Sequence, residues 1–302
     1  MNTIPAFAVI GGSNGFRLLG DGATGFTDIG RIRTPFGLSE PVFRKEHTAV
    51  PFYYMSRHGV SGYTVTAPFV NYRANVYALK MLSVKSILSW SGPGAIDTSY
   101  TVGDFVLPDD IIDETKYRAR TFYENTGLGF IRQNPVFCPC LEGFIVKVVK
   151  RAGLTLKKGG VYVCTDGPRL ETKAEIRKYA SYGGSFVGMT LAPEAFLARE
   201  LEMCYRPLCY ITNYAEGVVE RRYKSGELFE GMNDAGEKQK FEYAVSKLSD
   251  IVTAAAAELD ADSGLLSGDC SCRMSMERYR KRGDIDAKWW KHLSPGNKRT
   301  LR

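Results

Sequence analysis

The segment Ala6-Phe-Ala-Val-Ile10, followed directly by Gly11-Gly-Ser-Asn-Gly15, decides how this chain folds. The first five residues form a short apolar run, which predicts a buried strand, and the glycines after them predict a loop that can approach a ligand closely. The loop offers backbone N–H groups and a hydroxyl, as an anion site needs. Its spacing is neither that of a P-loop nor that of a complete dinucleotide fingerprint, and a plain tight turn explains it equally well.

The same arrangement of an apolar run and a polar end recurs along the chain. Further strands are predicted at residues 51–55, 86–91, 161–165, 186–189 and 208–212. Helical patterns lie at residues 70–82, where Asn71 is a candidate cap, and at 141–152, 172–182, 193–202 and 238–259. This alternation predicts an α/β fold with a parallel or mixed sheet and helices on both faces, in which ligands bind at the carboxyl ends of the strands.

Composition and charge set limits on the class of protein. The chain has 302 residues, 44% of them hydrophobic, and a formal net charge of +7. This size allows a substantial core, and the charge suits an anionic partner such as phosphate or nucleic acid. Basic residues outnumber acidic ones in the last thirty positions. A solvated basic tail explains them better than a nucleic-acid-binding arm, so we divide the chain into a domain at residues 1–260 and a tail at 261–302.

Neither a signal-peptide pattern nor a run of eighteen apolar residues occurs, so we expect a cytoplasmic protein without a membrane partner. Seven cysteines in a chain of this length do not make a disulfide scaffold. Cys270-Ser-Cys272, near the polar end of the chain, is expected to be exposed and able to pair with itself or a neighbour. Because no second Cys or His pair stands at ligand spacing, we expect no metal site.

Two polar segments that follow predicted strands are candidates for anion binding. Ser56-Arg57-His58-Gly59 places a permanent cation beside a hydrogen-bonding ring, which suits a phosphate oxyanion. Ser91-Gly92-Pro-Gly-Ala95 adds a hydroxyl and backbone donors. A solvated loop and a structural turn are the alternative explanations of these two segments.

Three later segments each place polar side chains after a strand. They are Thr165-Asp-Gly-Pro-Arg-Leu-Glu171, Val187-Gly-Met-Thr-Leu-Ala-Pro-Glu194 and Tyr210-Ile-Thr-Asn-Tyr-Ala-Glu-Gly217. In the first, Gly167-Pro168 predicts a fixed turn that directs Glu171 toward the strand ends. A favourable charge at a helix start is the alternative role for Glu171.

Taken together, these segments resemble the purine nucleoside phosphorylase and methylthioadenosine phosphorylase family. The matching motifs occur in the family's order between residues 7 and 258. They are Gly11-Gly12-Ser13, Thr34-Pro-Phe-Gly37, Arg57-His58-Gly59, Asn71-Tyr-Arg-Ala-Asn75, Phe137-Cys-Pro139, Gly167-Pro-Arg169, Gly188-Met-Thr190, Pro193-Glu194 and Thr212-Asn213.

The resemblance implies a single α/β domain with a mixed, partly barrel-like twisted sheet flanked by helices. It implies a homotrimer or a dimer of trimers that needs no cofactor and uses inorganic phosphate as a co-substrate. The phosphate ligands that it implies are Ser13, Arg57, His58, Ser91, Gly92 and Thr190. The residues that it places against the nucleoside are Gly188, Met189, Leu170 and Ala215.

Two positions carry the resemblance's information about the base. Asn213 stands where the family places the residue that hydrogen-bonds purine N7, and Glu171 stands where 6-oxopurine phosphorylases carry a glutamate that accepts N1–H. Methylthioadenosine phosphorylases have an aspartate at the first position and another two residues later, where this chain has Ala215. The resemblance therefore implies phosphorolysis of inosine, guanosine or methylthioinosine, because a buried polar group facing the wrong partner is costly.

Several alternatives stay open at this point. Leu170 replaces an aromatic residue of the family and Asn14-Gly15 replaces a Gly-Leu pair, which leaves room for a nucleoside-binding protein without turnover. A methylthioadenosine phosphorylase and a water-using nucleosidase are the other readings. No histidine occurs between His58 and His292, so the 5′ substituent can be hydroxyl or methylthio, and Phe130 is a candidate for a residue contributed by a neighbouring subunit. Cys270-Ser-Cys272 resembles a Cys-x-Cys of some archaeal members, linked there to redox and thermal stability, or is a coincidental pair.

Overall fold

The first predicted strand lies in the middle of the main sheet. The computed structural model describes residues 6–19, 25–46, 50–220, 235–261 and 270–296. β1 (Phe7–Gly11) is buried along its whole length and pairs in parallel with β6 (Phe52–Ser56) and β7 (Ser86–Ser91). Because a strand inside a parallel sheet is covered on both faces, an uninterrupted apolar run suits this position.

Most strands belong to two sheets, and the chain passes twice directly from a strand of one into a strand of the other. The larger has the order β11 (Leu156–Lys158), β9 (Phe105–Leu107), β14 (Cys204–Tyr210), β7, β1, β6, β5 (Val42–Lys45) and β2 (Phe26–Gly30). The smaller has the order β10 (Asp110–Asp113), β12 (Val161–Cys164), β13 (Gly184–Gly188), β8 (Gly94–Ala95) and β15 (Asn213–Tyr214). A separate two-stranded sheet pairs β3 (Arg33–Thr34) with β4 (Gly37–Leu38). The chain passes from β7 into β8 and from β14 into β15, so the polar residues at these two crossings lie where the sheets meet.

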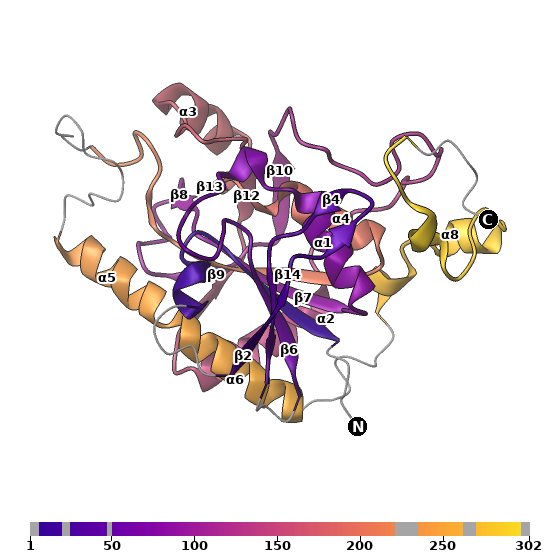
Figure 1. Ribbon diagram of the computed structural model, residues 1–302. Helices are drawn as coiled ribbons and strands as arrows, with labels where there is room; N and C mark the ends of the chain where they lie inside the picture. Colours follow the sequence, from indigo (N-terminus) through magenta and orange to yellow (C-terminus); the bar gives the residue numbers. More distant parts are fainter. Residues whose placement is uncertain (1–5, 20–24, 47–49, 221–234, 262–269, 297–302) are drawn as a thin grey trace.

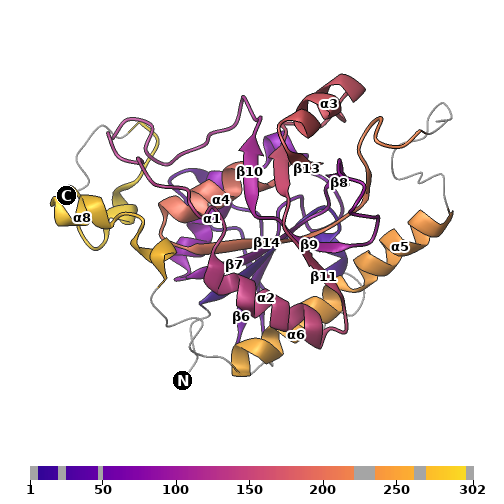
Figure 2. The same ribbon diagram turned by 180° about the vertical axis from the view of Figure 1, so that it is seen from behind.

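Helices cover both faces of the larger sheet. α1 (Tyr72–Met81) packs against α4 (Leu191–Glu200) on one side, and α2 (Pro139–Arg151) packs against α6 (Leu248–Ala261) on the other (Figures 1 and 2). The side chains of β1 alternate between these layers, since Ala8 and Ile10 belong to the first core and Phe7 and Val9 to the second. α3 (Lys173–Ser181) lies beside the smaller sheet, and α5 (Ala235–Ser246) precedes α6.

The predicted α/β domain with a mixed sheet flanked by helices is confirmed. Each strand predicted from the sequence overlaps an observed one, and Asn71 caps α1 by accepting a hydrogen bond from the backbone N–H of Ala74. The single long helix expected at 238–259 is wrong, because a turn at Lys247 separates α5 from α6. Neither Gly nor Pro stands at that turn, so the pattern of apolar residues carries no sign of it.

A solvated tail is the wrong description of residues 270–296. This segment forms η3 (Ser271–Met274), α8 (Glu277–Lys281) and η4 (Trp289–His292), and buries Met276, Tyr279 and Trp289 in the core. The exposure expected for Cys270 and Cys272 is also wrong, since they are only 5% and 1% exposed. Apolar residues spaced among basic ones anchor the segment, while the charges face outward or pair, as Arg280 does with Glu202. Residues 262–269 and 297–302 lie outside the described residues.

Among the helices of the described residues, none is long and apolar enough to cross a membrane.

A buried carboxyl joins the loop around residue 121 to α4. Glu200 is 6% exposed and accepts hydrogen bonds from the Thr121 hydroxyl at 2.6 Å and the Phe122 N–H at 2.7 Å. Burial raises the pKa of Glu200 to about 7, against an ordinary value of 4.5. The protonated group therefore stabilises the fold below about pH 4.5, and this contribution is lost as pH rises through about 7.

We expect Glu200→Gln to be more stable relative to the wild type at pH 8 than at pH 5, because the neutral amide avoids a buried charge. The difference in the free energy of unfolding between variant and wild type should change by on the order of 3 kcal/mol from pH 5 to pH 8. Urea unfolding of both proteins at each pH measures it. Glu242→Gln, at a carboxyl that is 51% exposed, is the control and should show a much smaller change. An equal pH response of the two variants would contradict the assignment.

Candidate active site

A cavity of about 600 Å³ lies at the carboxyl ends of β1, β7, β13 and β14. It is lined by the glycine-rich loop after β1, by residues where the chain passes from β7 into β8 and from β14 into β15, and by Phe241 of α5. The structure brings together every site residue predicted from the sequence except Arg57. The predicted residues that line the cavity are Ser13, His58, Ser91, Gly92, Leu170, Glu171, Gly188, Met189, Thr190, Asn213 and Ala215.

One part of the cavity holds a group of hydroxyls. The Ser91 Oγ lies 3.1 Å from the Thr190 Oγ1 and 2.9 Å from the Tyr162 phenol oxygen, and all three residues are buried. Gly188 is required beside them, since a Cβ at this position would stand 2.0 Å from the Tyr162 oxygen. Rotatable hydroxyls that can donate outward suit the oxygens of a bound anion.

His58 adds a ring nitrogen to this anion site. Its Nδ1 lies 2.8 Å from the carbonyl oxygen of Val65, which can only accept, so Nδ1 carries the proton and Nε2 is left with a lone pair. Burial, together with the positive charge of Arg57, lowers the pKa of His58 to about 3. The Tyr63 ring stacks on the imidazole at 4.3 Å between centroids. A neutral His58 can therefore accept a hydrogen bond from a protonated phosphate oxygen.

Arg57 lies behind the cavity instead of lining it. It is fully buried, and its guanidinium donates to Glu194 from Nε at 2.9 Å and from Nη2 at 2.7 Å. Further donors reach the Trp90 carbonyl at 2.9 Å and the Ser89 hydroxyl at 2.5 Å. The resemblance implied that Arg57 binds phosphate directly. In this structure, however, the guanidinium donates its Nε and Nη2 hydrogens to Glu194 and does not face the cavity. Its positive charge still acts on the adjacent cavity, where it helps to keep His58 neutral.

Glu171 occupies another part of the cavity. It is 9% exposed, and one carboxylate oxygen accepts a 2.5 Å hydrogen bond from the Thr165 hydroxyl. Burial raises the pKa of Glu171, and the Thr165 hydrogen bond partly opposes this shift. The alternative role at a helix start belongs to Glu175, which forms a capping box with Thr172 at the beginning of α3. Glu171 precedes that cap and is available to a ligand.

Asn213 lies at the crossing from β14 into β15, where neighbouring groups orient its amide. The Thr212 hydroxyl lies 2.7 Å from the Asn213 Oδ1, and the Asn213 Nδ2 donates to the Tyr214 carbonyl at 2.8 Å. The second hydrogen of Nδ2 remains for a ligand. Ala215, nearby on the same cavity wall, is 5% exposed and adds no polar group.

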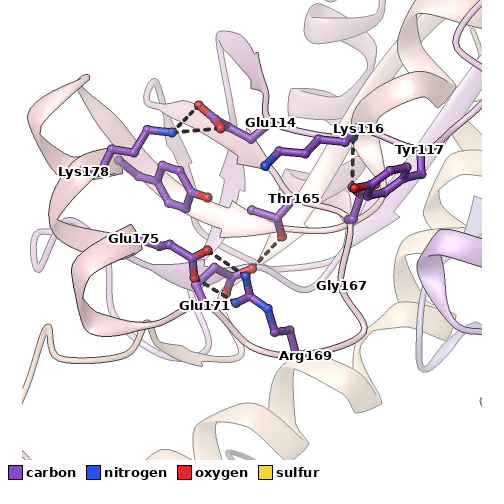
Figure 3. A pocket seen from close by; sticks show the side chains of 11 residues that line it. Glu114, Lys116, Tyr117, Thr165, Gly167, Arg169, Glu171, Glu175 and Lys178 are labelled. Carbon is purple, nitrogen blue, oxygen red and sulfur yellow. Dashed lines mark hydrogen bonds and ion pairs between the residues drawn. The ribbon is translucent and has the colours of Figure 1, made fainter.

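A smaller polar pocket of about 310 Å³ adjoins the cavity and shares Glu171 with it. Figure 3 shows the Thr165 and Glu171 side chains meeting there, with Arg169 paired to Glu175 and Lys178 paired to Glu114. Both ion pairs line this pocket together with Glu171. Exposed pairs of this kind contribute little to stability.

Sequence reasoning missed Arg118, which orders the loops beside the cavity. Arg118 is 8% exposed, and its guanidinium donates to four carbonyls, those of Thr165, Asp166, Met189 and Ala192, at 2.6 to 3.0 Å. Arg118 thereby ties the loop that leads to Glu171 to the loop that carries Thr190. No motif surrounds Arg118, since most of its hydrogen-bond partners are backbone carbonyls, which any sequence provides, although it also lies 3.4 Å from the Asp166 carboxylate.

We expect Arg118→Lys to lower the free energy of unfolding by about 2–4 kcal/mol, because an ammonium cannot reach four carbonyls that a planar guanidinium spans. Chemical denaturation measures the change. Arg120→Lys is the matched control on the same loop, where the side chain is 53% exposed and lies 3.9 Å from Asp113. Arg118 would have no positioning role if both variants were equally stable.

The arrangement combines an anion site with polar groups that suit the edge of a flat heterocycle. Similarity to known proteins agrees with this chemistry. Over 244 residues the chain is 36% identical to the 6-oxopurine nucleoside phosphorylase of Pyrococcus furiosus, covering 78% of this chain and 89% of that protein. Over 179 residues it is 45% identical to the probable S-methyl-5′-thioinosine phosphorylase of Methanopyrus kandleri, covering 59% of this chain and 69% of that protein.

Solved structures with the same fold include a methylthioadenosine phosphorylase from an antarctic soil metagenomic library. The TM-score is 0.76 and the identity 27%, over 90% of both chains. The sequence model of the phosphorylase superfamily matches residues 20–257. Fold, cavity and sequence similarity agree, and this chain belongs to the phosphorylase superfamily.

Proposed function

We propose that this protein cleaves 6-oxopurine nucleosides with inorganic phosphate, releasing the free base and ribose 1-phosphate or its 5-methylthio analogue. The observation that carries the proposal is that Glu171 and Asn213 line the same cavity as the Ser91 and Thr190 hydroxyls. The relatives named as 6-oxopurine nucleoside and methylthioinosine phosphorylases support it.

The hydroxyls of Ser13, Ser91 and Thr190 hold the phosphate, and backbone donors of the Gly12 and Gly92 loops assist. His58, neutral at physiological pH, accepts a hydrogen bond from the protonated phosphate oxygen. This leaves the remaining phosphate oxygens free to attack the anomeric carbon of the ribose. Arg57 contributes a positive field from behind the cavity wall. Fixed dipoles of this kind need no reorganisation during the reaction.

As the glycosidic bond breaks, positive charge develops on the ribose and negative charge on the purine. The free N–H of the Asn213 amide donates to N7 and stabilises the departing base. Glu171 accepts a hydrogen bond from N1–H, which a 6-oxopurine carries and an adenine does not. An adenine would leave the buried Glu171 carboxylate facing a lone pair, so the pair of residues selects 6-oxopurines.

The proposal also includes the oligomeric state and the residues around the 5′ group of the nucleoside. We propose a homotrimer or dimer of trimers in the cytoplasm, with no metal or organic cofactor taking part in the reaction. Phe130 is 81% exposed and does not line the cavity, as a residue that completes a neighbouring subunit's 5′ pocket would be placed. The apolar Met189 and Phe241 at the cavity wall suit a methylthio group as well as a hydroxyl.

We expect inosine, guanosine and methylthioinosine to release free base only when phosphate is supplied, with methylthioadenosine and adenosine turned over more slowly. Separation of base from nucleoside by chromatography, with and without phosphate, measures this. Release of base without phosphate would instead identify a nucleosidase. Binding of nucleoside without release of free base, with or without phosphate, would contradict the catalytic proposal.

We expect Asn213→Asp to raise kcat/KM for adenine nucleosides relative to 6-oxopurine nucleosides by roughly tenfold or more, because a carboxylic acid can protonate N7. The ratio of the two kcat/KM values measures the change. Asn14→Asp is the matched control, since Asn14 lines the cavity in the first loop and donates to Tyr210 at 3.0 Å. A ratio that stays the same in both variants would show that Asn213 does not face the base.

A further inference from the structure

Four cysteine sulfurs meet at the end of the main sheet that lies away from the cavity. The Sγ atoms of Cys138, Cys204, Cys270 and Cys272 all lie within 4.8 Å of one another, and the Cys138 and Cys270 sulfurs are 3.5 Å apart. Cys204 is the first residue of β14, whose other end leads to the cavity, and a strand of that length spans about 20 Å. The cluster is therefore separate from the proposed catalytic site.

Three distant segments supply these thiols, and each is held in place. Cys138 precedes α2, and its N–H donates to the Tyr205 carbonyl at 2.9 Å. Cys270 accepts a backbone hydrogen bond at 2.8 Å from Arg273, whose side chain reaches Ser86 at 3.2 Å. All four cysteines are at most 5% exposed. The sulfurs thus converge because of the backbone around them, in a region that excludes water.

We propose that these four cysteines form a tetrathiolate site for a zinc ion. A tetrahedral zinc with bonds of about 2.3 Å to sulfur places its ligands about 3.8 Å apart, a separation that lies within the observed range. All seven cysteines of the chain carry free thiols, so none of the four is committed to a disulfide. Four ligands close the coordination sphere, as in a structural site, and leave no position for a substrate.

Zinc binds cysteine in its thiolate form. The Cys138 thiol stands at the N-terminus of α2, where the helix dipole stabilises negative charge. Binding of the cation releases the remaining thiol protons to solvent. The buried Arg199 and the partly buried Arg273 lie near these thiols and would partly balance the net negative charge of the filled site.

The site would fasten the C-terminal segment to the sheet. Cys270 and Cys272 begin the segment that buries Met276, Tyr279 and Trp289, whereas Cys138 and Cys204 belong to the body of the domain. One ion would therefore cross-link three parts of the chain that are far apart in sequence. This explains a buried cluster of thiols that the proposed reaction does not use.

The full-length protein, purified under reducing conditions without added metal, should contain about one zinc ion per chain by elemental analysis. Cys204→Ala and Cys272→Ala should each reduce this to below roughly a fifth and expose the segment after residue 270 to proteolysis. Cys209→Ala is the matched control, a buried cysteine on the same strand as Cys204 and outside the cluster. Cys140→Ala, which removes the exposed thiol nearest Cys270, should also retain zinc.

Measurements on the unmodified protein keep the proposal testable if the variants fail to fold. Titration of its thiols with a mercurial should release zinc to a colorimetric chelator, and reconstitution with Co²⁺ should give the visible spectrum of a tetrahedral tetrathiolate. A protein without zinc, or with another metal in its place, would overturn the proposal. So would a mass lower by about 2 Da for each of one or two disulfides among these four cysteines.

Discussion

The buried ion pair between Arg57 and Glu194 is the interaction on which the rest of the structure depends. Both side chains are at most 1% exposed, and the Glu194 carboxylate also accepts hydrogen bonds from Ser89 and Tyr205. The pair therefore joins the end of β6, the middle of β7, α4 and β14. Breaking such a pair by removing one partner leaves a buried charge without compensation, which typically costs about 3–5 kcal/mol. This constraint fixes the relative positions of the elements whose ends form the cavity.

Hydrogen bonds hold the loops around the cavity in place. Arg118 binds backbone carbonyls of two loops, and paired hydroxyls hold Ser91 and Thr190 together. Arg57 and Arg118 do not line the cavity, whereas the charged residues Arg17, Lys238 and Glu171 do.

The two ends of the main sheet differ in their chemistry. The carboxyl ends of the strands carry glycine loops, hydroxyls and an amide, and they open into the cavity. The other end is closed by the C-terminal segment and the four buried cysteines. The parallel strands β1, β6, β7 and β14 run from one region to the other, so a rigid sheet separates a site that must admit ligands from one that holds the chain together.

The sequence by itself determined the α/β class, the buried first strand, the strands and helices around it, and the group of residues at the strand ends. These features follow from local periodicity and from motifs that each occupy a few consecutive residues, which a single sequence displays directly. It also indicated Glu171 and Asn213 as the residues of the proposed base site, since each stands in a recognisable motif. Loop glycines and the Asn71 cap belong to the same local information.

Only the tertiary structure decided which of these groups line the cavity and which lie behind it. Arg57 and Ser91 both stand at the carboxyl end of a strand, yet Glu194, 137 residues from Arg57, holds the Arg57 guanidinium in the core. The break between α5 and α6 and the packing of residues 270–296 also depend on distant contacts. The cysteine cluster is the clearest case. Its members stand at 138, 204, 270 and 272, without the spacing of a metal motif, and only the folding of three segments onto one end of the sheet brings their sulfurs together.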